Sequence, residues 1–173
     1  INSWESKNEE IKKAWALLFE RKLFDLNETE SFKYFYCSEG KYKDRIIIPF
    51  YDSYKQIFFF QARAIFPSQY PKYMNPPSEQ VKASHVLFPF DEESKEDLII
   101  CEGPADAISL QLNGINATCT MGSSISLEQI LQLLDYRGKI ILGYDNDEAG
   151  EKGLRRFEYL RKELQMPQFY ICF

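Results

Sequence analysis

The chain has 173 residues, of which 45% are hydrophobic and 16% aromatic, and its formal net charge is -5 at pH 7. This composition supports a substantial hydrophobic core, and it excludes a disordered chain and a uniformly basic nucleic-acid binder. No apolar run approaches the ~20 residues that a membrane-spanning helix needs, and residues 1–10 lack the apolar centre of a secretory signal. We therefore expect a folded, cytoplasmic protein without a membrane partner.

The first part of the chain predicts two helices. Apolar residues recur at helical spacing between residues 8 and 23 and predict an amphipathic helix there. Asn27 can then cap a second, shorter helix over residues 28–36. Together with the strands that follow, these helices predict a mixed α+β amino-terminal subdomain.

A hairpin is predicted next. Residues 45–51 and 56–66 are rich in β-branched and aromatic residues, and a polar turn separates them. Pro49 inside the first run indicates an edge strand or a bulge, because proline cannot donate a ladder hydrogen bond. Residues 67–89 show no clear period and predict a long loop, and loops of this length are often functional.

From residue 98 onward, apolar strand-like runs alternate with helix-like patterns. A proline suited to the first position of a helix follows the first run, and a capping-box pattern at Ser126 and Gln129 precedes another helix. The predicted strands are residues 98–101, 117–119, 139–144 and 168–172. Repeated strand, helix, strand order predicts parallel pairing with right-handed crossovers.

Carboxylates follow two of these predicted strands. Glu102 follows the first, and Asp145 and Asp147 follow the strand in KIILGYDNDEAG, residues 139–150. If these strands are neighbours, the carboxylates meet at the carboxyl edge of the sheet, where open α/β sheets bind ligands and where magnesium would find oxygen ligands. The alternative for this stretch is a polar turn that caps the next helix, and we expect Glu148 to serve as that cap.

A zinc site is not expected. The four cysteines and the single histidine, His85, show none of the spacings that zinc sites use. Cys101, Cys119 and Cys172 lie in or beside apolar runs, where buried, reduced thiols are typical.

Several motifs resemble those of a known family. EGPAD at residues 102–106 and DNDEAG at residues 145–150 resemble, in this order and placement, the two signatures of the Toprim fold. Upstream, RIIIPFYD, QARAIF and PKYMN resemble the RNA polymerase core of DnaG-type primases and of their tailed-phage relatives. The resemblance implies an α/β Toprim domain over residues 97–173, with a four-stranded, largely parallel sheet flanked by helices. A mixed α+β subdomain with a basic cleft would precede it over residues 1–96.

The resemblance also implies an activity and site residues. The enzyme would be a DNA-directed RNA polymerase of the primase type, a nucleotidyltransferase that makes short RNA primers for DNA replication. Its partners would be a single-stranded DNA template and ribonucleoside triphosphates. Glu102, Asp145 and Asp147 would be catalytic and, with Asp106, would hold magnesium, for which manganese can substitute. The residues that would bind nucleic acid or nucleotide are Arg45, Arg63, Lys72, Asn75 and Lys82.

Other interpretations remain open. Lys72 beside Tyr73 independently offers a phosphate contact and a stacking face, as expected where single strands run. Arg45 and Arg63 could instead be ordinary strand-end charges, and Lys82 an ordinary surface lysine. A Toprim nuclease or a non-catalytic Toprim nucleic-acid-binding module would share the same motifs.

Two departures from the bacterial family pattern lean toward the phage branch, which would place the protein in the host cytoplasm. Pro104 stands where bacterial members usually have an aromatic residue, and Ala62 stands where glycine is common. The family's further acidic cluster is expected beyond Phe173, so the Toprim domain is expected to continue there. Its zinc domain and its region for a replicative helicase are likewise expected outside this chain.

Overall fold

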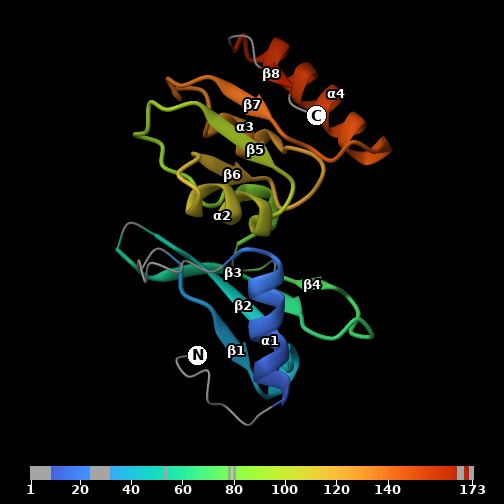
Figure 1. Ribbon diagram of the computed structural model, residues 1–173. Coiled ribbons are helices and arrows are strands. Elements are labelled where there is room, and N and C mark those ends of the chain that lie inside the picture. Colours follow the sequence, from blue (N-terminus) through green and yellow to red (C-terminus); the bar gives the residue numbers. More distant parts are fainter. Residues whose placement is uncertain are drawn as a thin grey trace. The chain divides into compact units, whose positions relative to one another are not determined.

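The chain folds into two compact units, residues Ile1–Val81 and Lys82–Phe173 (Figure 1). The computed structural model describes residues 9–23, 32–52, 54–77, 79, 81–166 and 170–171. The division between the units falls earlier than the boundary after residue 96 that the sequence favoured. The segment before that boundary is bound to the second unit: the buried Gln129 side chain donates to the Val86 carbonyl at 2.7 Å, and Phe88 forms an antiparallel bridge with Cys119.

The first unit is a helix and a four-stranded antiparallel sheet, with strand order β1-β2-β3-β4. The helix is α1 (Glu9–Glu20), in agreement with the amphipathic pattern. The strands are β1 (Phe35–Cys37), β2 (Arg45–Tyr51), β3 (Ile57–Ala64) and β4 (Tyr73–Met74), and a short 3-10 helix, η1 (Gly40–Tyr42), precedes β2. The predicted hairpin is confirmed as β2 and β3, which are paired over their whole length with one irregularity at Phe50 and Tyr51.

Two expectations for this unit are wrong in part. The end of the helix predicted over residues 28–36 is a strand in the structure. Phe35, Tyr36 and Cys37 pair with β2, and this pairing overrides the local helical pattern. Residues 24–31, including the proposed cap Asn27, lie outside the described residues. Pro49 does not mark an edge strand, because β2 lies between β1 and β3. The alternative, a bulge, agrees with the register irregularity at Phe50 and Tyr51, directly after Pro49. Pro49 lies beyond the three residues that β1 pairs, so no ladder bond to β1 is lost there.

The second unit is the predicted α/β unit. Its sheet has four strands in the order β6-β5-β7-β8, and all three neighbouring pairs are parallel. The strands are β5 (Leu98–Cys101), β6 (Ala117–Cys119), β7 (Ile140–Leu142) and β8 (Tyr170–Ile171). The helices are η2 (Ala83–His85), α2 (Pro104–Leu112), α3 (Leu127–Leu131) and α4 (Glu148–Glu163). The expected fold class is therefore confirmed.

The two faces of this sheet have separate cores. Leu98 and Ile100 of β5 belong to the larger cluster, which contains residues of β7, α3 and α4. Cys101 of the same strand belongs to a smaller cluster with Ala107 of α2 and Cys119 of β6. This alternation follows from the two-residue period of a strand. The sheet is thus covered on both faces, which leaves its carboxyl edge for chemistry.

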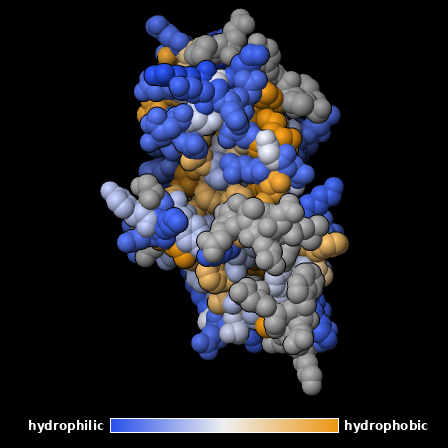
Figure 2. All heavy atoms as spheres, turned by 60° about the vertical axis from the view of Figure 1, so that its left-hand side comes forward, coloured by the Kyte–Doolittle hydropathy of each residue, from blue (hydrophilic) through white to orange (hydrophobic). Residues whose placement is uncertain are grey.

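The face shown in Figure 2 is largely hydrophilic and is interrupted by separate hydrophobic residues. None of the helices within the described ranges combines the length and the apolar character needed to cross a membrane. The predicted burial of Cys101 and Cys119 is confirmed, and both are free thiols; Cys172 lies outside the described residues.

Candidate active site

The carboxyl ends of the neighbouring strands β5 and β7 bring Glu102 and Asp145 together. Glu102 follows β5 directly, and Asp145 follows β7 after two residues. The Asp145 main-chain N–H donates a hydrogen bond to Oε1 of Glu102 at 3.1 Å. The predicted convergence of these two segments at one edge of the sheet is therefore present in the structure.

Asp147 also lies in this turn, and its side chain caps the helix that follows. Its Oδ1 accepts a hydrogen bond from the Gly150 N–H at 2.9 Å, which makes Asp147 the N-cap of α4. Glu148, expected to be the cap, is instead the first helical residue and pairs with Lys152 at 2.7 Å. That expectation is wrong because an aspartate side chain at this position reaches the free N–H groups of the first turn.

Gly150 allows α4 to approach the turn closely. A Cβ atom at this position would lie 2.0 Å from the Asp145 carbonyl oxygen and 3.1 Å from its carbonyl carbon. A Cβ atom at Gly153, one turn later, would lie 1.9 Å from the Ser123 carbonyl oxygen. Gly150 therefore lets α4 approach the Asp145 turn closely, and Gly153 lets the same helix approach the Ser123 main chain.

The carboxylates affect one another electrostatically. Burial raises the pKa of Glu102 above its ordinary value, the hydrogen bond from Asp145 opposes this rise, and the negative charges of Asp145, Asp147 and Asp106 add to it. Asp106 lies on the first turn of α2, and its Oδ2 is 3.3 Å from the position of a Cβ at Gly103. All four predicted acidic residues thus contribute to one negative region.

The donor set fits magnesium held partly by substrate. Magnesium is commonly bound by one or two carboxylates together with substrate phosphates and water. Within the part of the chain that the structure describes, no three His, Cys, Asp or Glu side chains form a complete metal-binding group. The pair of segments at Glu102 and Asp145 can supply one or two carboxylates. Burial is the main cause of the raised pKa of Glu102, and a cation there would offset the neighbouring negative charges that add to it.

This electrostatic arrangement predicts a pH dependence of stability. Because the folded-state pKa of Glu102 is raised above 4.5, the unfolded chain loses this proton first as the pH rises, so folding is progressively disfavoured until the folded-state pKa is passed. Glu102→Gln cannot ionise and keeps an acceptor oxygen for the Asp145 N–H. We expect wild type to lose thermal stability relative to Glu102→Gln over this window in metal-free buffer, as thermal melts between about pH 4 and 8 would measure.

Glu148→Gln is the matched control for that experiment, because Glu148 is an exposed carboxylate of the same turn and its partner is a lysine. A stability difference between wild type and Glu102→Gln that does not change with pH would contradict the prediction.

A cationic and aromatic surface lies on the first unit. The guanidinium of Arg63 is 4.7 Å, and the ammonium of Lys72 5.7 Å, from the centre of the Tyr73 ring. The nearby charge of Arg63 lowers the pKa of Lys72, with smaller contributions from burial and from Arg21. Nη1 of Arg63 is buried without a hydrogen-bond partner in the described structure. We call Arg21, Arg63, Lys72 and Tyr73 the basic surface.

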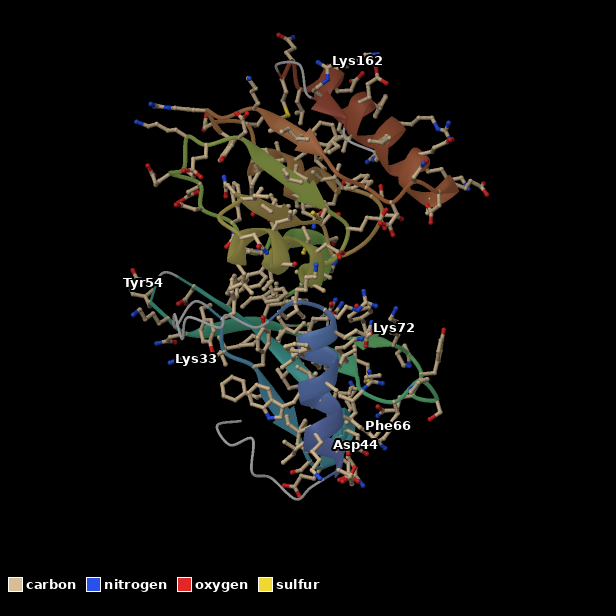
Figure 3. All side chains as sticks on the ribbon, viewed as in Figure 1. Lys33, Asp44, Tyr54, Phe66, Lys72 and Lys162 are labelled. Atoms are coloured by element: carbon tan, nitrogen blue, oxygen red, sulfur yellow. The ribbon has the colours of Figure 1, made fainter. Side chains whose placement is uncertain are left out.

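Sequence reasoning missed Arg21. This residue directly follows α1, and two hydrogen bonds close the helix end: Lys22 N–H to the Phe19 carbonyl at 3.0 Å and Leu23 N–H to the Leu18 carbonyl at 2.9 Å. With Lys22 at φ 54, this is a Schellman motif. Figure 3 shows Phe66 and Lys72 alongside α1, and Lys13 of that helix lies 4.7 Å from the Phe66 ring centre. The sequence shows that Arg21 is charged, but only tertiary packing brings it close to Lys72.

The remaining predicted binding residues lie in different environments. Arg45 is buried, with only 4% of its surface exposed. Asn75 accepts two hydrogen bonds. Its main-chain carbonyl accepts one from the Tyr42 hydroxyl at 3.2 Å, and its side-chain Oδ1 accepts one from Gln61 Nε2 at 3.3 Å. Lys82 is exposed and precedes η2, so it belongs to the second unit rather than to the basic surface.

Residues 99–173 match the family model described as Toprim-like. The second unit is therefore a Toprim-like domain.

The relatives of the chain are primases. It is 35% identical over 117 residues to a DNA primase of Thermotoga maritima, covering 64% of this chain and 20% of that protein. It is 31% identical over 129 residues to a DNA primase of Clostridium acetobutylicum, covering 70% of this chain and 22% of that protein. The chain thus spans about a fifth of the length of these relatives. It belongs to the DnaG-type primases, with a Toprim domain.

Solved structures show the same fold. The catalytic core of the E. coli primase superposes with a TM-score of 0.69 at 19% identity, covering 90% of this chain and 62% of that one. The primase fragment of the bacteriophage T7 primase-helicase superposes with a TM-score of 0.54 at 18% identity, covering 74% of this chain and 52% of that one. Membership of the phage branch stays a prediction.

Proposed function

We propose that this chain is part of the catalytic core of a primase, which synthesises short RNA primers on single-stranded DNA. The observation that carries the proposal is the hydrogen-bonded junction of Glu102 and Asp145 at the carboxyl edge of a parallel sheet, in a chain that belongs to the DnaG-type primases. Such an edge is where open α/β sheets bind ligands, and its carboxylates suit a metal-dependent phosphate reaction.

Glu102 and Asp145 would hold the metal, and Asp147 and Asp106 would support them. Magnesium at this site, or manganese in its place, would supply positive charge to neutralise phosphate oxygens and to favour loss of a proton from an attacking hydroxyl. The hydroxyl oxygen of a ribonucleotide forms a bond to the α-phosphorus of a nucleoside triphosphate, and the bond to the leaving pyrophosphate breaks. No side chain acts as a nucleophile.

The protein's own contribution is positioning. The Asp145 N–H fixes one oxygen of Glu102, and the cap from Asp147 to Gly150 fixes the turn on α4. Both contacts restrict the directions from which the carboxylates approach a ligand, and preorganised charges of this kind stabilise charge that develops during reaction.

The basic surface is proposed to bind the DNA template. Its cations have no carboxylate partner among the described residues, and the lowered pKa of Lys72 reflects positive charges that a phosphate would neutralise. Tyr73 is 37% exposed and can stack on a base. A solved DnaG primase catalytic domain bound to single-stranded DNA has the same fold, with a TM-score of 0.59 at 20% identity.

Removing a cation from the basic surface should weaken DNA binding. One phosphate contact on a single strand corresponds to a slope of about 0.7 in log affinity against log salt, hence about fivefold at ~0.1 M salt. We expect Lys72→Ala and Arg21→Ala each to weaken binding of a labelled oligothymidylate by about this factor, measured by fluorescence anisotropy at several salt concentrations. Lys12→Ala is the control, because Lys12 on α1 already pairs with Glu9 at 2.9 Å. Equal losses in all three variants would indicate only a general charge effect.

The activity itself is tested with the intact protein, labelled single-stranded DNA, ribonucleotides and metal. A primase makes new RNA products, a Toprim nuclease shortens the labelled DNA, and a non-catalytic module does neither. Shortened DNA without RNA products would reject the proposal. Binding to a replicative helicase is a separate proposal, which a pull-down with the intact protein would test.

A further inference from the structure

Arg45, at the start of β2, is a buried cation whose hydrogen bonds go to main-chain carbonyls. Its Nη1 donates to the carbonyl oxygens of Lys72 at 3.3 Å and Ala62 at 3.4 Å. In the parts of the chain that the structure covers, it has no carboxylate partner. A guanidinium with 4% of its residue surface exposed offers little area to a phosphate, although arginine is the usual residue for phosphate recognition.

One of these carbonyls belongs to Lys72 of the basic surface, and the other belongs to Ala62, which precedes Arg63 of that surface in β3. Ala62 is in β3, opposite Met74 of β4. The Lys72 carbonyl also accepts the Ala64 N–H at 2.9 Å, and Ala64 is the residue opposite Arg45 in the β2–β3 register. The Arg45 guanidinium therefore links the Ala62 carbonyl of β3 to the carbonyl of Lys72, the residue that precedes β4.

This anchor is needed because β4 is short. Only Tyr73 and Met74 form it, and they pair with Arg63 and Ala62 of β3. A strand of two residues makes few ladder hydrogen bonds, so additional bonds at its start have a large effect on its position. The exposed side chain of Lys72 extends from a main chain whose carbonyl is held by two donors.

We propose that Arg45 is a positioning residue for single-stranded DNA binding: it acts through the Lys72 carbonyl and does not itself contact the nucleic acid. The inference rests on the proposed role of the basic surface. It differs from the role that the family resemblance implies for Arg45, in which this arginine belongs to the surface that handles template and nucleotide.

Hydrogen exchange tests the anchor without DNA. In Arg45→Met, which keeps an unbranched side chain but removes the donors, the Ala64 amide should exchange at least about tenfold faster, because its acceptor carbonyl is no longer fixed. In Lys72→Ala the main-chain carbonyl remains and the exchange should be unchanged. Lys43→Met, which removes an exposed cation of the same unit, is the control for net charge. Unchanged exchange at Ala64 in Arg45→Met would overturn the inference.

A double-mutant cycle tests how Arg45 acts on DNA. We expect Arg45→Met and Lys72→Ala each to weaken oligothymidylate binding by about fivefold at ~0.1 M salt, and the double variant to bind as Lys72→Ala does. A further loss of about fivefold in the double variant, with a further drop of about 0.7 in the salt slope, would show that Arg45 makes its own phosphate contact and would overturn the inference. Unchanged binding in Lys72→Ala would instead reject the proposed DNA surface itself, and the positioning role with it.

A measurement on the wild-type protein covers the case in which Arg45→Met does not fold. Phenylglyoxal modifies accessible arginines, and modified positions are identified by mass spectrometry. Arg45 should stay unmodified with or without oligothymidylate, whereas exposed Arg21 should be modified in free protein and protected by the oligonucleotide. Modification of Arg45 in free protein that DNA suppresses would overturn the inference.

Discussion

Glu102→Gln and Asp145→Asn are expected to reduce primer synthesis by at least about 10³-fold while leaving the fold intact. Each substitution removes a negative charge that would hold the metal, and loss of several kcal/mol of transition-state stabilisation corresponds to this factor. The hydrogen bond between these two residues needs one acceptor oxygen, which Glu102→Gln retains, and a main-chain N–H donor, which Asp145→Asn retains. Dinucleotide formation with magnesium and with manganese is the measurement.

Glu148→Gln is the matched control for these variants, because it removes a carboxylate from the same turn that points to Lys152. It should leave primer synthesis unchanged. A second readout separates metal binding from catalysis: magnesium should raise the melting temperature of wild type and raise that of Glu102→Gln less, since a ligand that binds the folded state stabilises it. Full dinucleotide formation by either acidic-site variant would reject the metal assignment.

The acidic site could be predicted from the sequence because short-range patterns determine it. Apolar runs that alternate with helical patterns predict parallel strands, and residues directly after neighbouring parallel strands must meet at one edge. Glu102 directly follows β5, and Asp145 follows β7 after two residues, so the Asp145 N–H can donate its hydrogen bond to Glu102 at this edge. The sequence predicted Glu148 as the N-cap of α4, whereas the N-cap is Asp147. The prediction failed because the identity of the cap depends on the exact residue at which the helix begins.

The basic surface could be predicted only in part, because long-range packing determines it. Arg45 and Arg63 lie on neighbouring strands, and the sequence does not distinguish their environments. In the structure Arg63 lies against the Tyr73 ring, whereas Arg45 is buried and donates a hydrogen bond to the Lys72 carbonyl. Arg21 joins Lys72 only through the packing of α1. The boundary between the units likewise depends on Gln129, whose bond to Val86 spans a separation that no local pattern reveals.

Gly150→Ala is expected to lower the free energy of unfolding by about 1–3 kcal/mol, because a Cβ 2.0 Å from the Asp145 carbonyl oxygen forces the turn to move. Alanine's better helix propensity contributes up to about 1 kcal/mol in the opposite direction, so the clash is the larger effect. The Asp145 carbonyl must shift by about 1 Å to reach ordinary contact, and misplacement of this size can cost about 10²-fold in rate. Urea unfolding and dinucleotide formation measure the two effects.

Gly122→Ala separates the clash from the mere addition of a methyl group. A Cβ at Gly122 meets no atom within 4 Å, so its unfolding free energy should stay within about 0.5 kcal/mol of wild type. If Gly150→Ala were as stable as Gly122→Ala and retained full activity, the Asp145 turn would have to tolerate displacement. The close approach of α4 would then be unnecessary, and the site would depend on the carboxylates themselves rather than on how rigidly α4 holds them.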